Sequence, residues 1–229
     1  MQPRQGAFAE LLRMPERNLV AIPEAMSYLN AALTEPVATA WHAVMRAQAA
    51  SACPLSEAKI LVLGGGAIGI STALVLASFG CTNLLLGETN ALRRETVRKT
   101  QVCELYDPIN DAGPEDNSFD IVLDAVGGRA TREASSKAVK PGGTIIHIGL
   151  MDSNDGLDIR KFTLQEITFS GCYTYTMKDF RDTVEALHSG KLGDLNWIEQ
   201  RPLSEGSSAF LDLSQGKTAA AKIILIPDH

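Results

Sequence analysis

The stretch Ile60-Leu-Val-Leu-Gly64-Gly-Gly66-Ala-Ile-Gly69 decides the fold of this 229-residue chain. Its first four residues are apolar, which predicts a buried strand, and three glycines follow in a GxGxxG spacing. Gly64 permits a tight turn, Gly66 lets the backbone approach a pyrophosphate, and Gly69 lets the next helix pack closely on the strand. The N–H groups near Ala67 and Ile68 would then face a diphosphate at the positive end of that helix.

Strands and helices alternate along the chain around this motif. We expect strands over 60–63, 83–86, 119–124, 144–148 and 167–173, and helices over 37–51, 69–79, 91–102, 131–139 and 179–187. Pro141-Gly142-Gly143 is expected to turn the chain into the fourth strand. The alternation predicts parallel strands with right-handed crossovers, the doubly wound α/β (Rossmann) class.

Three segments are expected. Residues 1–35 contain short extended pieces with proline turns, residues 36–191 form the dinucleotide-binding domain, and residues 192–229 leave the alternating pattern. The last segment ends in an apolar strand over 223–226, and we expect it to pack beside residues 1–35.

Glu88 is the expected cofactor selector. It follows the second strand at the separation from the glycine motif that a dinucleotide-binding fold requires. A carboxylate there accepts hydrogen bonds from the ribose hydroxyls and repels a 2′-phosphate, which favours NAD over NADP. Arg93 and Arg94 lie close by and offer guanidinium groups that suit a phosphate. The alternative for Glu88 is an ordinary surface acid in a turn.

Two further turns follow expected strands, where folds of this class bind ligands. Ala125-Val126-Gly127 is a candidate to flank the adenosine half of the cofactor, and Ile148-Gly149-Leu150 is a candidate to line the nicotinamide. Glycine that serves only the turn is an equally good interpretation of each.

Composition excludes several classes of protein. The net charge is −6 with no basic stripe, which gives nucleic-acid binding no electrostatic support. Residues 60–87 carry no charge over a membrane-spanning length, but glycines interrupt them, so strand, turn, helix and strand explain them better than a membrane segment. Four scattered cysteines fit neither a zinc site nor a disulfide framework. Without a signal peptide, this pattern predicts a cytoplasmic protein.

A methyltransferase that binds S-adenosylmethionine is an alternative from another class. Such enzymes also have a glycine-rich loop, an acid after the second strand and a Pro-Gly-Gly before a late strand. The spacing of Gly64, Gly66 and Gly69 favours the dinucleotide, and the C-terminal region shows no reversed hairpin of the methyltransferase kind.

The chain also resembles a known family, the zinc-containing medium-chain alcohol dehydrogenases, and within it the polyol and sorbitol branch. The resemblance runs over essentially the whole chain. It is carried by Gly6-Ala-Phe-Ala-Glu10, Pro15-Glu-Arg-Asn18, Ala31-Ala-Leu-Thr-Glu35-Pro36, His42-Ala-Val44, the glycine motif, Val122-Leu-Asp-Ala-Val-Gly-Gly128, Lys140-Pro-Gly-Gly143 and Gly171-Cys-Tyr-Thr-Tyr175.

This resemblance implies zinc-assisted hydride transfer between an alcohol or polyol and NAD, because zinc lowers the pKa of the alcohol beside the nicotinamide. Glu35 matches an acid that joins the zinc site directly or through water, although an acid favoured by a helix N-terminus explains it equally well. Glu88 and Arg93 match residues at the ribose. Val126, Ile148 and Cys172 match positions along the cofactor walls.

The resemblance also implies what this chain lacks. The family also binds its zinc through a Cys and through a Gly-His-Glu motif, and neither has a counterpart here. Residues 1–35 therefore match only the remnant of a GroES-like β catalytic domain. We expect NAD binding with little turnover for a small-molecule alcohol or polyol, without resident zinc. A non-catalytic NAD-binding module is the alternative. The family further implies a homodimer or homotetramer, with the strand over 167–173 paired with its copy.

Overall fold

A six-stranded parallel sheet forms the centre of the computed structural model, which describes residues 6–152 and 154–227. The strand order is β3-β2-β1-β4-β5-β6, as expected for a doubly wound fold. The strands are β1 (Ile60–Leu63), β2 (Leu84–Gly87), β3 (Glu104–Tyr106), β4 (Phe119–Asp124), β5 (Val139–His147) and β6 (Thr168–Gly171). The prediction of a parallel α/β sheet is confirmed.

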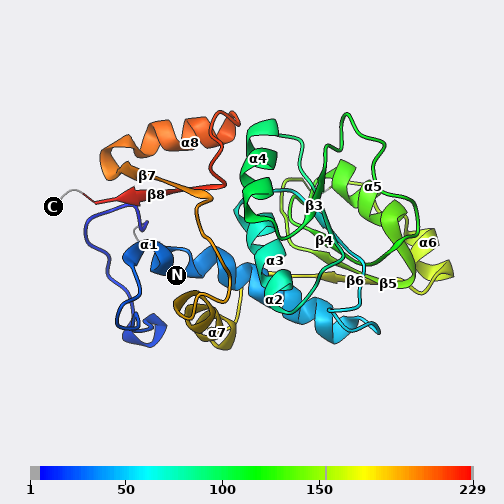
Figure 1. Cartoon of the computed structure of the whole chain (residues 1–229), viewed down its shortest axis with the longest axis horizontal. Helices are drawn as coiled ribbons and strands as arrows, with labels where there is room; N and C mark the ends of the chain where they lie inside the picture. Colours follow the sequence, from blue (N-terminus) through cyan, green and yellow to red (C-terminus); the bar gives the residue numbers. More distant parts are fainter. Residues whose placement is uncertain (1–5, 153, 228–229) are drawn as a thin grey trace.

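Helices cover both faces of the sheet (Figure 1). On one face lie α2 (Thr34–Ala50), α3 (Ala67–Ser78) and α4 (Ala91–Thr100), and on the other lie α5 (Arg129–Ala138) and α6 (Ile159–Leu164). Two more helices, α1 (Tyr28–Ala32) and α7 (Met177–His188), pack against α2. Alternation along β1 divides the core, because successive side chains point to opposite faces. Ile60 and Val62 pack in the cluster with α2 and α3, whereas Leu61 and Leu63 pack in the cluster with α5 and α6.

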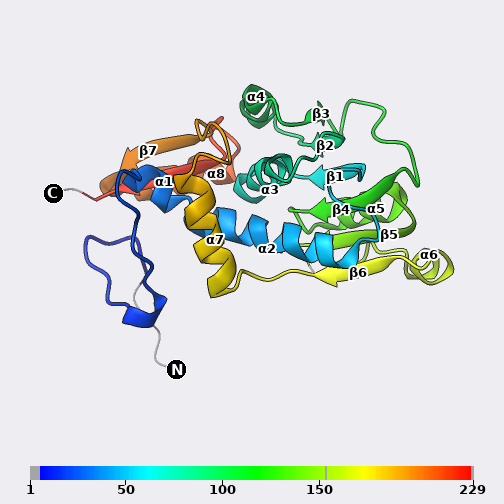
Figure 2. The same cartoon turned by 60° about the horizontal axis from the view of Figure 1, so that its bottom comes forward.

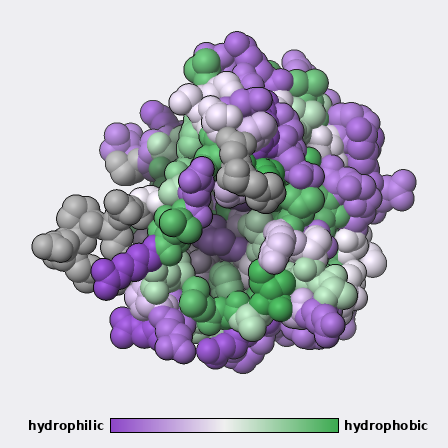
Figure 3. Space-filling model, turned by 90° about the vertical axis from the view of Figure 1, so that its left-hand side faces the viewer, coloured by the Kyte–Doolittle hydropathy of each residue, from purple (hydrophilic) through white to green (hydrophobic). Residues whose placement is uncertain are grey.

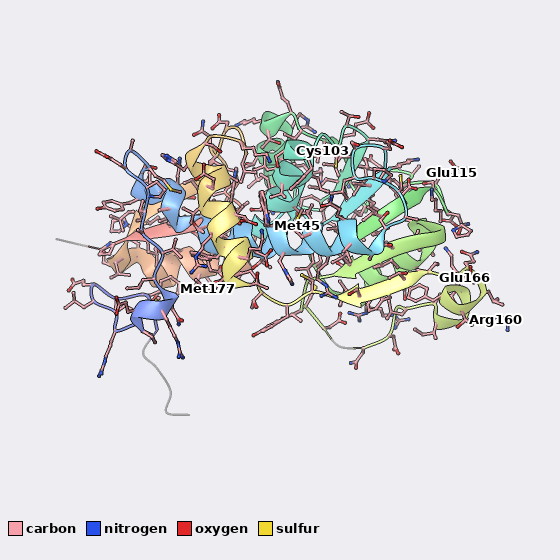
Figure 4. The ribbon with its side chains drawn as sticks, turned by 90° about the horizontal axis from the view of Figure 1, so that it is seen from below. Met45, Cys103, Glu115, Arg160, Glu166 and Met177 are labelled. Carbon is pink, nitrogen blue, oxygen red and sulfur yellow. The ribbon has the colours of Figure 1, made fainter. Side chains whose placement is uncertain are left out.

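Helix α2 fills the space between the sheet and α7. Figure 4 shows Met45 of α2 in this position, and it places Arg160 of α6 at the end of the molecule away from the C-terminal unit. Val37, Ala40 and Val44 of α2 are fully buried, so this helix turns an apolar face to the core. The helix begins at Thr34, three residues before the expected start.

The Pro141-Gly142-Gly143 turn was placed wrongly. These residues lie inside β5, where the pairing with β4 shifts register after Phe119 and Val139. Gly142 takes a φ of +72°, and its N–H donates to the Gln165 carbonyl at 2.7 Å. These three residues therefore form a bulge within β5 and not a turn before it, because the strand already pairs at Val139, ahead of the glycines.

The C-terminal part forms a second, smaller sheet. Here β7 (Ile198–Pro202) pairs in parallel with β8 (Lys222–Ile226), and α8 (Gly206–Ser214) connects them. Figures 1 and 2 place this unit at one end of the molecule, beside the N-terminal segment. Phe8 and Phe210 join the two with ring centroids 5.4 Å apart.

The C-terminal unit also contacts helix α4. The side-chain amide of Asn90 donates to the Gly216 carbonyl at 2.9 Å, and the Thr96 hydroxyl donates to the Ala219 carbonyl at 2.8 Å. A Cβ atom added to Gly216 would lie 2.7 Å from that Asn90 amide nitrogen, so the close approach requires glycine. These contacts bring residues near the end of the chain beside the turn that follows β2.

The charge-free residues 60–87 are resolved into β1, the glycine turn, α3 and β2. In the described ranges, no helix has the length and apolar character needed to cross a membrane.

Candidate cofactor-binding site

The glycine loop joins β1 to α3 with the geometry that the sequence predicts. Gly64 has a φ of +97°, a backbone conformation that side chains disfavour. A Cβ on Gly69 would lie 1.7 Å from the Gly64 carbonyl oxygen, so this glycine lets the helix cross the strand end. A Cβ on Gly66 would meet no protein atom within 4 Å. The backbone at Gly66 therefore borders open space.

Helix α3 starts at Ala67, two residues before the expected start, with Gly66 as its N-cap. As a glycine, Gly66 has no side chain with which to cap this end. The N–H groups of Ala67 and Ile68 therefore belong to the first turn, whose amides have no partner within the helix. Together with the helix dipole, they form a binding place for an anionic group.

Glu88 is buried directly after β2, with 6% of its surface exposed. One carboxylate oxygen, Oε2, accepts a hydrogen bond of 2.7 Å from the Gly65 N–H, and Oε1 accepts one of 2.7 Å from the Asn90 N–H. The carboxylate thus lies against the glycine loop, and it is not the ordinary surface acid of the alternative interpretation. Its position at the carboxyl end of β2 is the one that a ribose-binding acid requires.

The two arginines near Glu88 differ in their surroundings. Arg94 donates to the carbonyl oxygens of Glu88 and Thr89 at 2.7 Å and pairs with Asp107 at 2.8 Å, so its guanidinium holds the turn together. Arg93 lies with Nη1 3.9 Å from Glu88 Oε2 and is a quarter exposed. Of the two, Arg93 is the one whose guanidinium lies beside the Glu88 carboxylate.

The turns after β4 and β5 pack backbone against backbone. A Cβ on Gly127 would lie 2.0 Å from the Gly149 carbonyl oxygen, and a Cβ on Gly149 would lie 2.0 Å from the Val126 carbonyl carbon. The sequence offered glycine for a turn as the alternative, but these two glycines also serve a close approach. As a result, Val126 and Ile148, the expected cofactor walls, belong to adjacent turns.

Asp124, which was not predicted as a site residue, orders this region. The carboxylate is fully buried and accepts hydrogen bonds from the N–H groups of Val126 and Gly127 at 3.0 and 2.8 Å. Its other oxygen accepts from the Thr131 hydroxyl at 3.0 Å and lies 3.1 Å from His147 Nδ1. The available signal was an acid that ends a buried strand three residues before a glycine, Gly127.

Cys172 follows β6 and donates its N–H to the His147 carbonyl at 2.9 Å. Burial raises the pKa of its thiol to about 11, so the sulfur is a neutral, apolar group at physiological pH. That state suits a wall of a cleft, whereas a zinc ligand is a thiolate.

Glu35 lies exposed in the first turn of α2. Burial raises the pKa of the Tyr175 phenol, and the nearby Glu35 carboxylate raises it further. Within residues 6–152 and 154–227, no three His, Cys, Asp or Glu side chains lie close enough together to hold a metal ion. These residues do not fit a zinc centre, and Glu35 as a metal ligand stays a prediction.

A buried carboxylate joins α2 to α7 beside this region. Asp179 Oδ2 lies 2.9 Å from His42 Nδ1 and accepts from the Thr176 N–H at 2.9 Å and the Thr176 hydroxyl at 2.5 Å. Burial by itself raises the pKa of Asp179, but the hydrogen bonds from Thr176 and His42 outweigh it and leave the pKa below its usual range.

This arrangement predicts an acid-dependent loss of stability. Because the pKa of Asp179 is lowered on folding, its contribution is complete above the unfolded value and is lost as the pH falls through the folded value. Asp179→Asn should lower the free energy of unfolding by about 1–2 kcal/mol at pH 7 and flatten its decline below about pH 4. Urea unfolding at several pH values measures this. Asp182→Asn, on the same helix, is the control, and parallel curves for Asp179→Asn and the parent chain would contradict the prediction.

An apolar groove of about 590 Å³ lies away from the glycine loop, between residues 12–34 and α7. Apolar side chains gather around a hollow on the end of the molecule seen in Figure 3. Leu12, Met14 and Ile22 contribute to the groove and are more than two fifths exposed.

A glycine loop at a helix start, an acid directly after β2 and glycine-containing turns after β4 and β5 are typical of a dinucleotide-binding α/β domain. Comparison with known proteins gives the family: the sequence model of the zinc-binding dehydrogenases matches residues 67–189. The chain belongs to the zinc-binding dehydrogenase family, and its relatives include enzymes named as alcohol and polyol dehydrogenases.

Two relatives from Saccharomyces cerevisiae illustrate the match. The chain is 28% identical to a (R,R)-butanediol dehydrogenase over 98% of its own length and 61% of that protein. It is 26% identical to sorbitol dehydrogenase 1 over 99% of its own length and 66% of that protein. The chain thus spans about three fifths of the length of these relatives.

Solved structures show the same fold. An alcohol dehydrogenase from Thermus sp. ATN1 superposes with a TM-score of 0.85 at 20% identity, over 98% of this chain and 68% of that one. An acetophenone reductase from Geotrichum candidum, solved with NAD, gives 0.79 at 21% identity, over 90% and 58%. A zinc-binding dehydrogenase from Sinorhizobium meliloti, solved with NADP, gives 0.78 at 22% identity, over 90% and 62%.

Proposed function

We propose that this chain is the NAD-binding part of an oxidoreductase that transfers hydride between a secondary alcohol or polyol and NAD. The observation that carries the proposal is the buried Glu88 carboxylate, held 2.7 Å from the Gly65 amide inside the glycine loop. The cofactor, when bound, supplies or accepts the hydride at its nicotinamide ring. The chain itself binds and orients the two halves of the dinucleotide.

In the proposed complex, the amides of Ala67 and Ile68 bind the pyrophosphate, and Gly66 leaves the space that it needs. Glu88 accepts hydrogen bonds from the adenosine ribose in place of the one from Gly65. Arg93 stands beside that ribose.

The two halves of the cofactor meet different walls. We propose that Ala125 and Val126 flank the adenosine half, and that Ile148, Gly149 and Cys172 line the nicotinamide. Ile148 and Cys172 are both buried in the core cluster beside α2 and α3, which places them on the same side of the sheet. An apolar lining suits a ring that must be shielded from water during hydride transfer.

NAD is favoured over NADP because of the charge at the ribose. A 2′-phosphate would meet the Glu88 carboxylate in a buried place, where like charges repel strongly. Arg93 would reduce this repulsion only in part, because its own charge already lies 3.9 Å from Glu88.

Calorimetric titration with NADH, and with NADPH for comparison, tests the proposal. We expect micromolar binding of NADH and at least tenfold weaker binding of NADPH, about 1.4 kcal/mol apart. Binding of neither would refute the dinucleotide site. Preference for S-adenosylmethionine would replace it with the methyltransferase alternative.

Substrate and turnover need a separate measurement. Relatives named for butanediol and sorbitol suggest vicinal diols and polyols as substrates. Incubation with NAD, butane-2,3-diol or sorbitol, followed at 340 nm, distinguishes an active enzyme from a binding module. We assign no step to zinc, because the described residues do not assemble a site for it.

We also propose that residues 36–191 form the cofactor domain, with 1–35 and 192–229 as a second unit.

We further propose a homodimer in which β6 pairs with its copy. β6 is an edge strand of the sheet. It carries the exposed apolar residue Phe169, and exposed Leu164 ends the helix just before it. Light scattering after size-exclusion chromatography should give twice the mass of the chain. Thr168→Lys places a charge on the exposed edge and should shift the mass to that of one chain. A monomeric parent chain would contradict the proposal.

A further inference from the structure

Arg132 of α5 is a buried arginine whose five N–H groups all have acceptors. Nε donates to the Asp155 carbonyl at 2.5 Å, and Nη1 donates to the carbonyls of Gly127 and Asp152 at 2.9 and 3.1 Å. Nη2 donates to the Asp152 carboxylate and to the Asn154 carbonyl. Because a guanidinium has five donors in a rigid fork, this one side chain fixes the residues after β5 against the turn after β4.

The same two turns are joined by backbone hydrogen bonds. The Met151 N–H donates to the Val126 carbonyl, and the Asp152 N–H donates to the Gly127 carbonyl, both at 3.2 Å. The Asp152 carboxylate also accepts from the Arg129 N–H at 3.0 Å, at the start of α5. The Arg132 side chain therefore adds hydrogen bonds to Gly127 and Asp152 that are shorter than the backbone hydrogen bond between those two residues.

The segment that Arg132 holds does not relax into an ordinary conformation. Asp155 has a φ of 54° and Gly156 a φ of 93°, both in the left-handed region. A Cβ on Gly156 would lie 2.5 Å from the Arg129 carbonyl oxygen. Such a backbone persists only where its surroundings determine it, and Arg132 donates to three backbone carbonyls of this segment and to the Asp152 carboxylate.

We propose that Arg132 is a positioning residue for the cofactor: it sets the place of the Ile148-Gly149 wall relative to the Val126 wall. This inference rests on the proposed function, since those walls flank the nicotinamide and adenosine halves. The glycine loop and Glu88 follow β1 and β2, and the five hydrogen bonds of the Arg132 side chain all go elsewhere. Arg132 thus affects how the nicotinamide half is held, and the adenosine phosphate and ribose are bound independently of it.

The test compares NADH with AMP, which lacks the nicotinamide half, on Arg132→Lys and on a matched control. Lysine keeps the charge but replaces the five-donor fork by a single ammonium group. We expect Arg132→Lys to weaken NADH binding about tenfold and AMP binding less than twofold, since charged hydrogen bonds of this kind are worth about that much. Arg129→Ala removes an exposed arginine one turn earlier on α5 and should change neither affinity.

Asp152→Asn is the second variant, and it keeps the loop residue while removing the charge that Arg132 pairs with. We expect it to weaken NADH about threefold with AMP unchanged, because a neutral partner gives a weaker hydrogen bond. Equal losses for NADH and AMP, or no loss in either variant, would overturn the positioning role while leaving the proposed function intact. A parent chain that binds neither ligand would overturn both.

Discussion

Replacing Gly69 by alanine is expected to destabilise the fold by at least about 3 kcal/mol, because the new Cβ would overlap a backbone atom. That Cβ would lie 1.7 Å from the Gly64 carbonyl oxygen, and neither the strand end nor the helix start can move without disturbing the core. Thermal unfolding followed by circular dichroism measures the effect, with an expected drop in Tm of about 6–12 °C.

Gly66→Ala is the matched control in the same loop. Its Cβ would enter open space, and its φ of −71° is one that alanine adopts freely, so the Tm should change little. NADH binding should nevertheless fall, because the methyl group would stand where we place the pyrophosphate. Equal stability of the Gly69→Ala and Gly66→Ala proteins would contradict the close packing assigned to Gly69.

The second large effect is expected for Glu88→Ser. Loss of a carboxylate that binds the ribose hydroxyls should weaken NADH by about tenfold to hundredfold, the range for hydrogen bonds to a charged group. NADPH should bind more tightly, because the repulsion is removed and Arg93 is freed to approach a 2′-phosphate. Titration calorimetry with both cofactors measures the reversal.

Glu95→Ser is the control for charge alone, since Glu95 lies exposed on α4 and pairs only with Arg98 among the ion pairs of the described residues. It should leave the ratio of the two affinities unchanged. A Glu88→Ser protein that still prefers NADH as strongly as the parent would show that another residue selects the cofactor.

Local patterns predicted the sheet and the glycine loop well. β1 and β4 were expected at the residues where they occur, because short apolar runs between turn residues have few alternatives. Asparagine just before a helix is a common N-cap, and the Asn90 side chain accepts from the Arg93 N–H of α4 at 3.1 Å. Such features depend on neighbours within a few positions along the chain.

Features set by distant residues were not predictable in this way. β3 is three residues long and only partly buried, and α6 and α8 are short and lack a long apolar period. The link between Asp124 and His147 joins two strands across 23 positions. The fully paired state of Arg132 depends on a loop that follows another strand, so its polar sequence neighbourhood resembled an ordinary solvated helix.

The contact between α4 and the C-terminal unit has a consequence for biosynthesis. The carbonyl oxygen that Asn90 binds belongs to a residue 126 positions later. During translation at about 5–20 residues per second, the turn that carries Glu88 therefore emerges from the ribosome several seconds before Gly216 exists. The glycine loop and the Glu88 carboxylate that its Gly65 amide binds are free to assemble early, whereas the Asn90 side chain finds its partner only after Gly216 is made. A nascent chain could thus form both parts of the proposed cofactor site before α4 is joined to the C-terminal unit.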